Sequence, residues 1–512
     1  MAHGPVAIGA VVAAAILALV AGSLAAVALR GAGGWPGPAD WVALRFTLGQ
    51  AALSAVLSVA LAVPVARALA RRRFPGRAAL ISLMGAPFLL PVIVAVLGLI
   101  AVFGRQGWFN DALAVLGLPR MSVYGLHGVV LAHVFLNLPL AVRMVLMGWQ
   151  AIPAERLRLA ASLDFGPVEM FRHLERPMLR AVLPGAALAV FLICLTSFAV
   201  ALTLGGGPGA TTVELAIYQA LRFEFDPGRA AVLALMQVAL GGAAVLAAAR
   251  VTVPAGFGPG LDRLAERHDA RTPWLRAQDA VAIGAAAAFL LGPLAAVVWR
   301  GLPGLVDLPA AVWPAAARSV AVAAVSTALT LAAAVALARA VVAGARWVEL
   351  AGMLPLALSG LALGTGLFLI VHPFVAPERL ALPVTALVNA LLSLPFALRL
   401  ILPALREIEA SHGRLADSLG LTGRARLLRL VLPRLRRPLG LAAGLVVALA
   451  MGDLGVIALF AGEAEATLPL IVHRLMGAYR MQAAAGAALV LVALSFALFF
   501  LCDRWGRGDA AA

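Results

Sequence analysis

One acidic and several polar side chains lie within segments that are otherwise apolar. Asp453 is the acidic residue, and placing its carboxylate in a hydrocarbon environment costs at least about 2.5–3.5 kcal/mol. Such a carboxylate can be the counter-charge of a cationic ligand; alternatively, it forms a structural hydrogen bond to a neighbouring helix or lies near the membrane surface. The other candidates for a polar pathway are His133, Asn137, Ser197, Asn389 and Ser393.

His133 and Asn137 are four residues apart, so a helix presents both on one face. Asn389 and Ser393 repeat that spacing later in the chain. Polar groups between membrane helices commonly hydrogen-bond across the helices, and contact with a transported molecule is the alternative role. We expect interhelical hydrogen bonding to be the commoner role at these four positions.

The basic residues exclude several kinds of chemistry. All 40 of them in the 512-residue chain are arginine, so the chain contains neither a Walker A phosphate loop, which needs a lysine, nor a Schiff-base lysine. Cys194 and Cys502 lie far apart in apolar segments and indicate neither a disulfide framework nor a metal site. We therefore predict a chain that is not an enzyme and has no cofactor or metal. If ATP drives its function, another subunit binds the ATP.

The composition is that of an integral membrane protein. Hydrophobic residues make up 63% of the chain and charged residues 12%, whereas soluble domains carry about 25% charged residues. A membrane-spanning helix needs about 20 mostly apolar residues, and twelve segments meet that requirement. The first is too long for the apolar part of a signal peptide and lacks a basic leader, so we interpret it as a span. The predicted spans lie near 6–29, 41–69, 79–104, 122–147, 179–204, 229–249, 277–299, 311–338, 347–371, 380–404, 438–461 and 481–502.

The distribution of arginine predicts the orientation of these spans. Of the 40 arginines, 29 fall in alternate connecting segments, and positively charged loops stay on the cytoplasmic side of a membrane. Because twelve spans bring both ends of the chain to one side, both termini are predicted to be cytoplasmic. This orientation explains the net charge of +16, so no nucleic-acid partner is expected. The arginine-rich segments are 66–77, 143–180, 250–276, 339–346, 399–437 and 503–507.

The chain repeats itself at an offset of 256 residues. Polar landmarks keep this register from His133 to about residue 200, and Ser197 falls opposite Asp453. A constant offset across loops and helices indicates two six-helix units rather than chance similarity. Since both units begin and end on the cytoplasmic side, they are parallel repeats. We predict a first unit at 1–255, a cytoplasmic linker at 256–276 and a second unit at 277–512.

The longest predicted cytoplasmic loops within the units, 150–178 and 406–434, occupy equivalent places. In the second loop Leu415 and Leu419 lie at helical spacing, Gly420 permits a turn, and arginines cover the remaining surface. This pattern predicts a short amphipathic helix, a bend and a second helix. Such helices can lie on the lipid surface or dock onto a partner protein, and the pattern alone favours neither.

The spacing within these loops resembles the EAA loop of bacterial ABC importer membrane subunits, which reads Glu-Ala-Ala, three residues, Gly, nine residues and Ile-x-Leu-Pro. The resemblance implies a coupling helix that inserts into a groove on an ATPase subunit, with one docking point in each loop. This chain departs from the motif because both Glu positions are arginine and the first Gly position is aspartate. The positions concerned are Arg158, Leu159, Ala160, Asp164 and Pro177, and Arg414, Leu415, Ala416, Leu419, Gly420 and Pro433.

Two further stretches, 197–219 and 452–460 with 467–470 and 476–482, resemble membrane subunits of thiamine/thiamine pyrophosphate ABC importers. The resemblance covers most of the chain. It implies an all-α integral membrane protein of the bacterial inner membrane, with 12 transmembrane helices in two fused, parallel six-helix repeats of the type I ABC importer permease. It also implies two cytoplasmic ATP-binding subunits, a periplasmic binding protein and a thiamine-like substrate. The residues at 213–221 themselves suit a short external helix that contacts the binding protein. The thiazolium of such a substrate is a cation that Asp453 could balance, in the first of the two roles given above for its carboxylate.

Other functions remain open on the sequence. Ferric-iron importer subunits share the fused layout, and a permease for another small solute would have the same architecture. An ion-coupled secondary transporter also often has twelve helices, but it usually needs several ionisable groups within the membrane, and Asp453 is the clearest one. A membrane-embedded enzyme is disfavoured because His, Asp and Glu do not cluster at one depth.

Overall fold

The computed structural model describes residues 3–85, 90–248, 250 and 272–508, and within these ranges all regular elements are helices. The first predicted unit contains α1 (His3–Gly31), α2 (Pro38–Arg71), α3 (Arg77–Leu83), α4 (Val92–Phe103), α5 (Trp108–Val115), α6 (Leu126–Gln150), α7 (Ala154–Ser162), α8 (Pro167–Met170), η2 (Phe171–Glu175), α9 (Arg176–Leu195), α10 (Ala199–Leu204), η3 (Pro208–Ala210), α11 (Val213–Arg222) and α12 (Pro227–Ala248). The predicted linker lies outside the described residues as far as position 271, and its residues 273–276 already belong to α13.

The helices after this linker again combine long and short elements. They are α13 (Pro273–Gly304), α14 (Val312–Val342), α15 (Trp347–Met353), η5 (Leu354–Ala357), α16 (Gly360–Val371), η6 (Pro377–Leu380), α17 (Ala381–Ser418), α18 (Gly423–Arg426), η7 (Leu427–Val431), α19 (Leu432–Arg434), α20 (Arg436–Met451), α21 (Gly455–Phe460), α22 (Leu468–Gly477) and α23 (Met481–Arg507).

The helices confirm the predicted spans. Among the described residues eleven helices are long and apolar enough to cross a membrane, and the bent pair Trp347–Ala357 and Gly360–Val371, with 95° between its arms, gives a twelfth span. Four predicted spans are each formed by two helices, which hydropathy does not detect because it measures apolar content and not helix continuity. These spans consist of α3 and α4, α9 and α10, α15 and α16, and α20 and α21.

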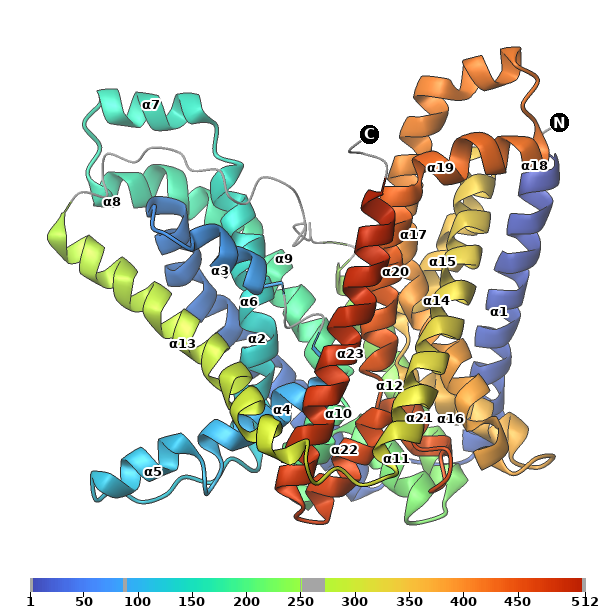
Figure 1. Ribbon diagram of the computed structural model, residues 1–512, viewed down its shortest axis with the longest axis horizontal. Coiled ribbons are helices and arrows are strands. Elements are labelled where there is room, and N and C mark those ends of the chain that lie inside the picture. Colours follow the sequence, from blue (N-terminus) through green and yellow to red (C-terminus); the bar gives the residue numbers. More distant parts are fainter. Residues whose placement is uncertain (1–2, 86–89, 249, 251–271, 509–512) are drawn as a thin grey trace.

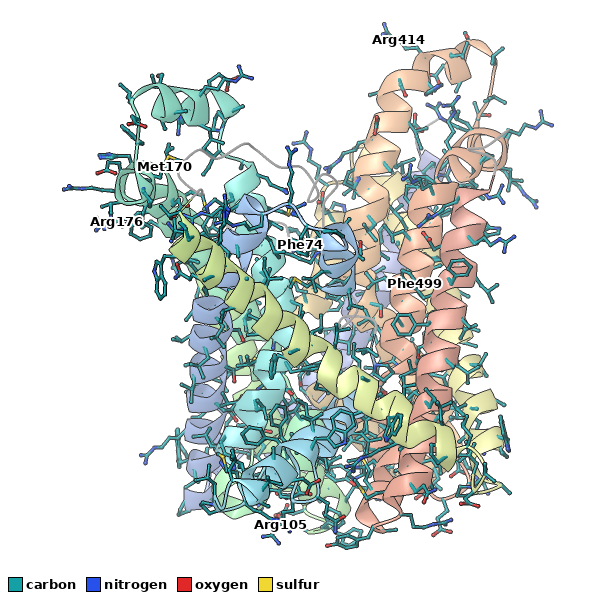
Figure 2. All side chains as sticks on the ribbon, turned by 60° about the vertical axis from the view of Figure 1, so that its left-hand side comes forward. Phe74, Arg105, Met170, Arg176, Arg414 and Phe499 are labelled. Carbon is teal, nitrogen blue, oxygen red and sulfur yellow. The ribbon has the colours of Figure 1, made fainter. Side chains whose placement is uncertain are left out.

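The two ends of the helix bundle carry different elements (Figure 1). One end, here called the loop end, carries α7, α8, α18 and α19, together with the start of α1 and the end of α23. The opposite end, here called the far end, carries α5, α11 and α22. Figure 2 shows Arg414 at the loop end and Arg105 at the far end. The first and last helices therefore have their outer ends on the same side of the bundle, as an even number of spans requires.

Exposed tryptophans mark both ends of the bundle. Of the nine in the chain, only Trp149 is buried. Indole rings favour the boundary between hydrocarbon and water, and these rings lie near helix ends, so they delimit the membrane-facing part of the bundle. The far-end group is Trp35, Trp41, Trp108, Trp299 and Trp313, and the loop-end group is Trp274, Trp347 and Trp505.

The first helix of each unit packs against the other unit. Helix α1 lies against α14 and α16 as well as α12, and α13 lies against α2 and α4 as well as α23 (Figure 1). Glycines permit both crossings: a methyl group on Gly366 of α16 would lie 2.1 Å from Ser23 Oγ, and one on Gly98 of α4 would lie 2.6 Å from the Pro293 carbonyl oxygen. Small residues of this kind let membrane helices approach closely.

Candidate functional site

The two loops at the loop end differ in how their first helix is built. In the first loop α6 ends at Gln150 and a separate helix, α7, follows. In the second loop α17 runs without interruption for 38 residues from the membrane to Ser418. The expected separate amphipathic helix is therefore confirmed in the first loop, whereas in the second it is the continuation of a span. Proline explains the difference, because Pro153 immediately precedes α7 and removes a helical donor.

Both loop helices end in the same turn. Asp164 has a φ of 51° and Gly420 a φ of 66°, and the amide of the next residue bonds back to Ala160 O at 3.0 Å or Ala416 O at 2.9 Å. This bond from the sixth residue to the first closes a Schellman turn, which needs a left-handed residue. Aspartate tolerates that conformation better than most residues, so the missing glycine does not change the turn.

Two leucine pairs project from these helices into the surroundings. Leu159 and Leu163 are 60% and 58% exposed in the first loop, and Leu415 and Leu419 are 58% and 66% exposed in the second. Each pair lies at i and i+4 and therefore on one helix face. The neighbouring alanines, Ala160 and Ala416, are buried, while Arg158, Pro177, Arg414 and Pro433 are exposed. We call these faces the docking faces of the two loops, after the partner contact that the resemblance to the EAA loop predicts.

Breaks in three different spans meet inside the bundle. A methyl group on Gly452, at the end of α20, would lie 3.2 Å from the Cα atom of Pro91, the residue before α4. A methyl group on Gly455, at the start of α21, would lie 3.7 Å from the ring of Phe198 between α9 and α10. Non-helical backbone at membrane depth is tolerated only where protein buries it or it lines a polar cavity. This junction is the candidate substrate path.

Asp453 and Ser197 occupy equivalent breaks at this junction, between α20 and α21 and between α9 and α10. The Asp453 carboxyl faces the first backbone amides of α21 and the side chain of Asn389 on α17. Its Oδ2 atom and Asn389 Nδ2 are both covered, and neither has a hydrogen-bond partner within the described parts of the chain. Ser393 is buried one turn further along α17. One carboxyl oxygen and one amide nitrogen that lack partners are thus on neighbouring side chains.

An aromatic pair borders the same junction. The rings of Phe198 and Tyr218 lie edge to face with centroids 5.3 Å apart, and Tyr218 also meets Phe223 edge to face at 5.6 Å. Phe198 is buried and Tyr218 is half-buried. Since Phe198 is the residue that approaches Gly455, this pair stands next to the break that holds Asp453. An aromatic surface and a carboxyl therefore lie on adjoining elements.

His133 and Asn137 make contacts between helices. Ser54 Oγ on α2 lies 3.4 Å from His133 Nδ1, and Asn137 Nδ2 donates to Cys194 Sγ on α9 at 3.4 Å. Asn137 also donates to the backbone carbonyl of His133. Both side chains thus contribute to the packing of α2, α6 and α9, as expected of polar groups between membrane helices.

The buried carboxyl of Glu214 was not among the predicted site residues. Glu214 of α11 has no exposed surface, and its nearest polar groups are Gln237 of α12 and Ser359, the N-cap of α16. The short helix expected at 213–221 is α11, which lies at the far end (Figure 1) with most of its residues buried against α2, α12 and α16. A carboxylate within an apolar segment, the signal that identified Asp453, was present for Glu214 also.

Comparisons with known proteins give the family of the chain. It is 42% identical to the thiamine transport system permease protein ThiP of Salmonella typhimurium over 476 residues, which cover 91% of this chain and 89% of the relative. The protein of the same name from Escherichia coli is 40% identical over 92% of this chain and 90% of the relative. A more distant relative, the molybdenum transport system permease protein ModB of Azotobacter vinelandii, is 30% identical over 35% of this chain and 78% of the relative.

A scan against protein-family models found no match. A further relative, the protein of the same name from Haemophilus influenzae, is 32% identical over 91% of this chain and 89% of the relative. Relatives that align along both predicted units exclude a similarity confined to one loop or one span. The chain therefore belongs to the family of thiamine transport system permease proteins.

Proposed function

We propose that this chain is the membrane-spanning subunit of an ABC importer for thiamine or its phosphates. The observation that carries the proposal is the presence of two matching docking faces at one end of the bundle. Contiguous exposed apolar surface can mark a contact with another protein, and two like leucine pairs at equivalent places in the two units suit two copies of one ATPase subunit. A secondary transporter would have no need of them. The family supports the substrate, because its members are named for thiamine transport.

On this proposal the loop end faces the cytoplasm. The arginine-rich segments 66–77, 143–180 and 399–437 gather there, and both terminal helices end there (Figure 1). The far end then faces the periplasm, where a binding protein delivers the substrate. ATP hydrolysis takes place on the separate ATPase subunits, and the docking faces transmit their motion to the spans. The spans then alternate between a state open to the periplasm and a state open to the cytoplasm.

The junction of broken spans is the proposed substrate path. Asp453 supplies a negative charge to the thiazolium, Asn389 supplies an amide donor, and Phe198 with Tyr218 supplies an aromatic surface. Cations are attracted to aromatic faces as well as to carboxylates, so this combination suits an aromatic cation. Ser197 faces the junction from the first unit, while His133, Asn137 and Ser393 hold the surrounding helices in place.

Uptake by intact cells tests the proposal. Cells lacking this chain should lose uptake of labelled thiamine and regain it when the chain is restored, and deletion of the partner ATPase should abolish that rescue. Labelled ferric iron serves as the comparison substrate. Uptake of iron instead of thiamine would overturn the substrate assignment, and thiamine uptake that survives loss of the ATPase would overturn the importer mechanism.

The substitution Asp453→Asn tests the substrate path separately. It keeps the shape of the side chain and removes the charge, so thiamine uptake should fall at least tenfold while co-purification with the ATPase is unchanged. Asp503→Asn is the matched control, because Asp503 pairs with Arg507 at the loop end of α23, away from the junction. Normal uptake by the Asp453→Asn chain would refute the counter-charge role.

A further inference from the structure

Glu175 connects the first loop to the end of α2. It is the last residue of η2, a π-helical segment that follows the docking face of that loop. Its carboxylate lies 2.8 Å from Arg67 Nε and 3.5 Å from Arg71, and the side chain of Glu175 has no exposed surface. A buried carboxylate needs such partners, because the removal of one partner leaves an uncompensated charge.

The same arginines extend this connection to the other unit. Arg71 lies 3.9 Å from Asp279 Oδ1, and Arg72 Nε lies 2.6 Å from Asp279 Oδ2. Asp279 belongs to α13, the first helix of the second unit, and its side chain is only 4% exposed. Charged side chains from the first loop, from α2 and from α13 thus form a continuous series of ion pairs, here called the ion chain. Glu175 is the member of the ion chain that belongs to the first loop.

The second loop has a different connection. It contains a π-helical segment at the equivalent place, η7, but the residue that corresponds to Glu175 is the buried Val431. Arg339 of α14 donates to the Gly423 carbonyl oxygen at 3.4 Å, and Arg426 pairs with Glu409 of α17. Those groups all belong to the second unit. Within the residues that the structure describes, the ion pairs of this loop therefore stay inside its own unit.

We propose that Glu175 is a positioning residue that makes the first loop move α2 and α13 together, so that one ATPase contact drives helices of both units. The second loop, which lacks this ion chain, drives helices of its own unit. The two ATPase contacts are then mechanically inequivalent although their docking faces match. This inference rests on the proposed function, because it assumes that an ATPase pushes on the loops.

The coupling ratio of the complete complex tests this role. The permease, its ATPase and its binding protein are reconstituted in liposomes, and the thiamine molecules transported per ATP hydrolysed are measured. Glu175→Gln and Asp279→Asn should each lower that ratio at least fivefold while the ATPase stays bound and hydrolyses ATP. Glu175→Asp, which keeps the charge, should restore most of the ratio.

A matched control uses an ion pair at the same end outside the ion chain. Glu349 of α15 pairs with Arg406 of α17 at 3.1 Å, and both side chains are exposed. Glu349→Gln should leave the coupling ratio unchanged. An unchanged ratio in both Glu175→Gln and Asp279→Asn, or an equal loss in Glu349→Gln, would overturn the proposal.

A distance measurement on the chain alone separates this inference from the proposed function. Spin labels are placed at Ser162 in the first loop and Trp274 at the start of α13, in a chain whose two cysteines are replaced by alanine. Both Glu175→Gln and Asp279→Asn should broaden the distance distribution between these labels. A control pair at Ser418 and Trp505 should be unaffected. If the distance distribution between Ser162 and Trp274 stays narrow in both variants, the proposed role of the ion chain is refuted whatever the substrate is. Failure of the unmutated complex to transport thiamine would refute only the proposed function.

Discussion

Asp164 and Gly420 adopt the same left-handed backbone conformation at the same point of the two loops, although one residue has a side chain and the other has none. Their φ angles are 51° and 66°, and each turn is closed by a bond from the following amide to the alanine five residues earlier. The two units thus share the backbone conformation of this turn. Glycine, the residue that suits a left-handed conformation best, is present only in the second unit.

This relationship predicts opposite effects of two substitutions. Nothing lies within 4 Å of a methyl group added to Gly420, so Gly420→Ala should weaken the second turn by about 1 kcal/mol through backbone strain alone. Asp164→Gly should relieve strain in the first turn and strengthen it by up to about 1 kcal/mol. Hydrogen exchange of the amides in each turn measures both effects. The same exchange rate in both variants and the unmutated chain would contradict the argument.

The leucine pairs of the docking faces should determine retention of the ATPase. Replacing Leu415 and Leu419 by serine removes apolar area that docking buries, which corresponds to about 2 kcal/mol and so to more than a tenfold loss of affinity. Leu159 and Leu163 should give a similar loss. Co-purification of the ATPase from detergent measures the effect.

The control for this measurement is a serine pair at the far end. Leu116 and Leu118 are 71% and 51% exposed, comparable with the docking leucines, but they lie beyond α5 and away from the loop end. Their replacement should leave ATPase retention unchanged. Retention that falls equally in this control would show a general effect of lost surface apolarity and no specific docking.

The crossings of α1 and α13 with the other unit should be sensitive to one methyl group. Gly366→Ala would bring a methyl group 2.1 Å from Ser23 Oγ, and Gly98→Ala would bring one 2.6 Å from the Pro293 carbonyl oxygen. Overpacking of this kind costs about 1–3 kcal/mol, so the thermal unfolding temperature of the purified chain should fall in both variants. Gly22→Ala and Gly284→Ala are matched controls on α1 and α13, since nothing lies within 4 Å of the added methyl groups. Equal unfolding temperatures in all four variants would contradict the close approach.

Glu214 should make the stability of the chain depend on pH. Burial away from water raises the pKa of this carboxyl from 4.5 to about 8, and contacts with Ser359 and Gln237 offset only part of the shift. Between these values the folded chain holds a proton that the unfolded chain has lost, so the free energy of unfolding falls as pH rises. The fall is at most about 1.4 kcal/mol per pH unit.

Glu214→Gln keeps the size of the side chain and removes its ionisation, so the variant should lose this dependence and exceed the unmutated chain in unfolding temperature at pH 8. The two chains should converge towards pH 5. Glu463→Gln, at an exposed position of the far end, is the control. A variant that retains the full pH dependence would show that another group is responsible.

The sequence was sufficient for features that depend on local composition and spacing. Twelve apolar segments predicted the spans, because a helix that meets lipid must be apolar along its whole length. The spacing of Leu415, Leu419 and Gly420 predicted a helix face and its closing turn, since both are properties of neighbouring residues. It did not predict that this helix is the end of α17 and not a separate short helix. The constant offset also identified Asp164 as the counterpart of Gly420, and the structure gives both residues the same turn.

The tertiary structure alone decided which of these segments meet. Hydropathy does not distinguish a continuous span from two helices joined by a break, so the junction of Pro91, Phe198 and Asp453 was not predicted. The packing of α1 and α13 against the opposite units depends on small residues far apart in the chain, such as Ser23 and Gly366, whose closeness no local pattern encodes. The ion chain is of the same kind, because Glu175 and Asp279 share partners only after the two units have packed together. Local spacing therefore determined the elements, and long-range packing determined the site.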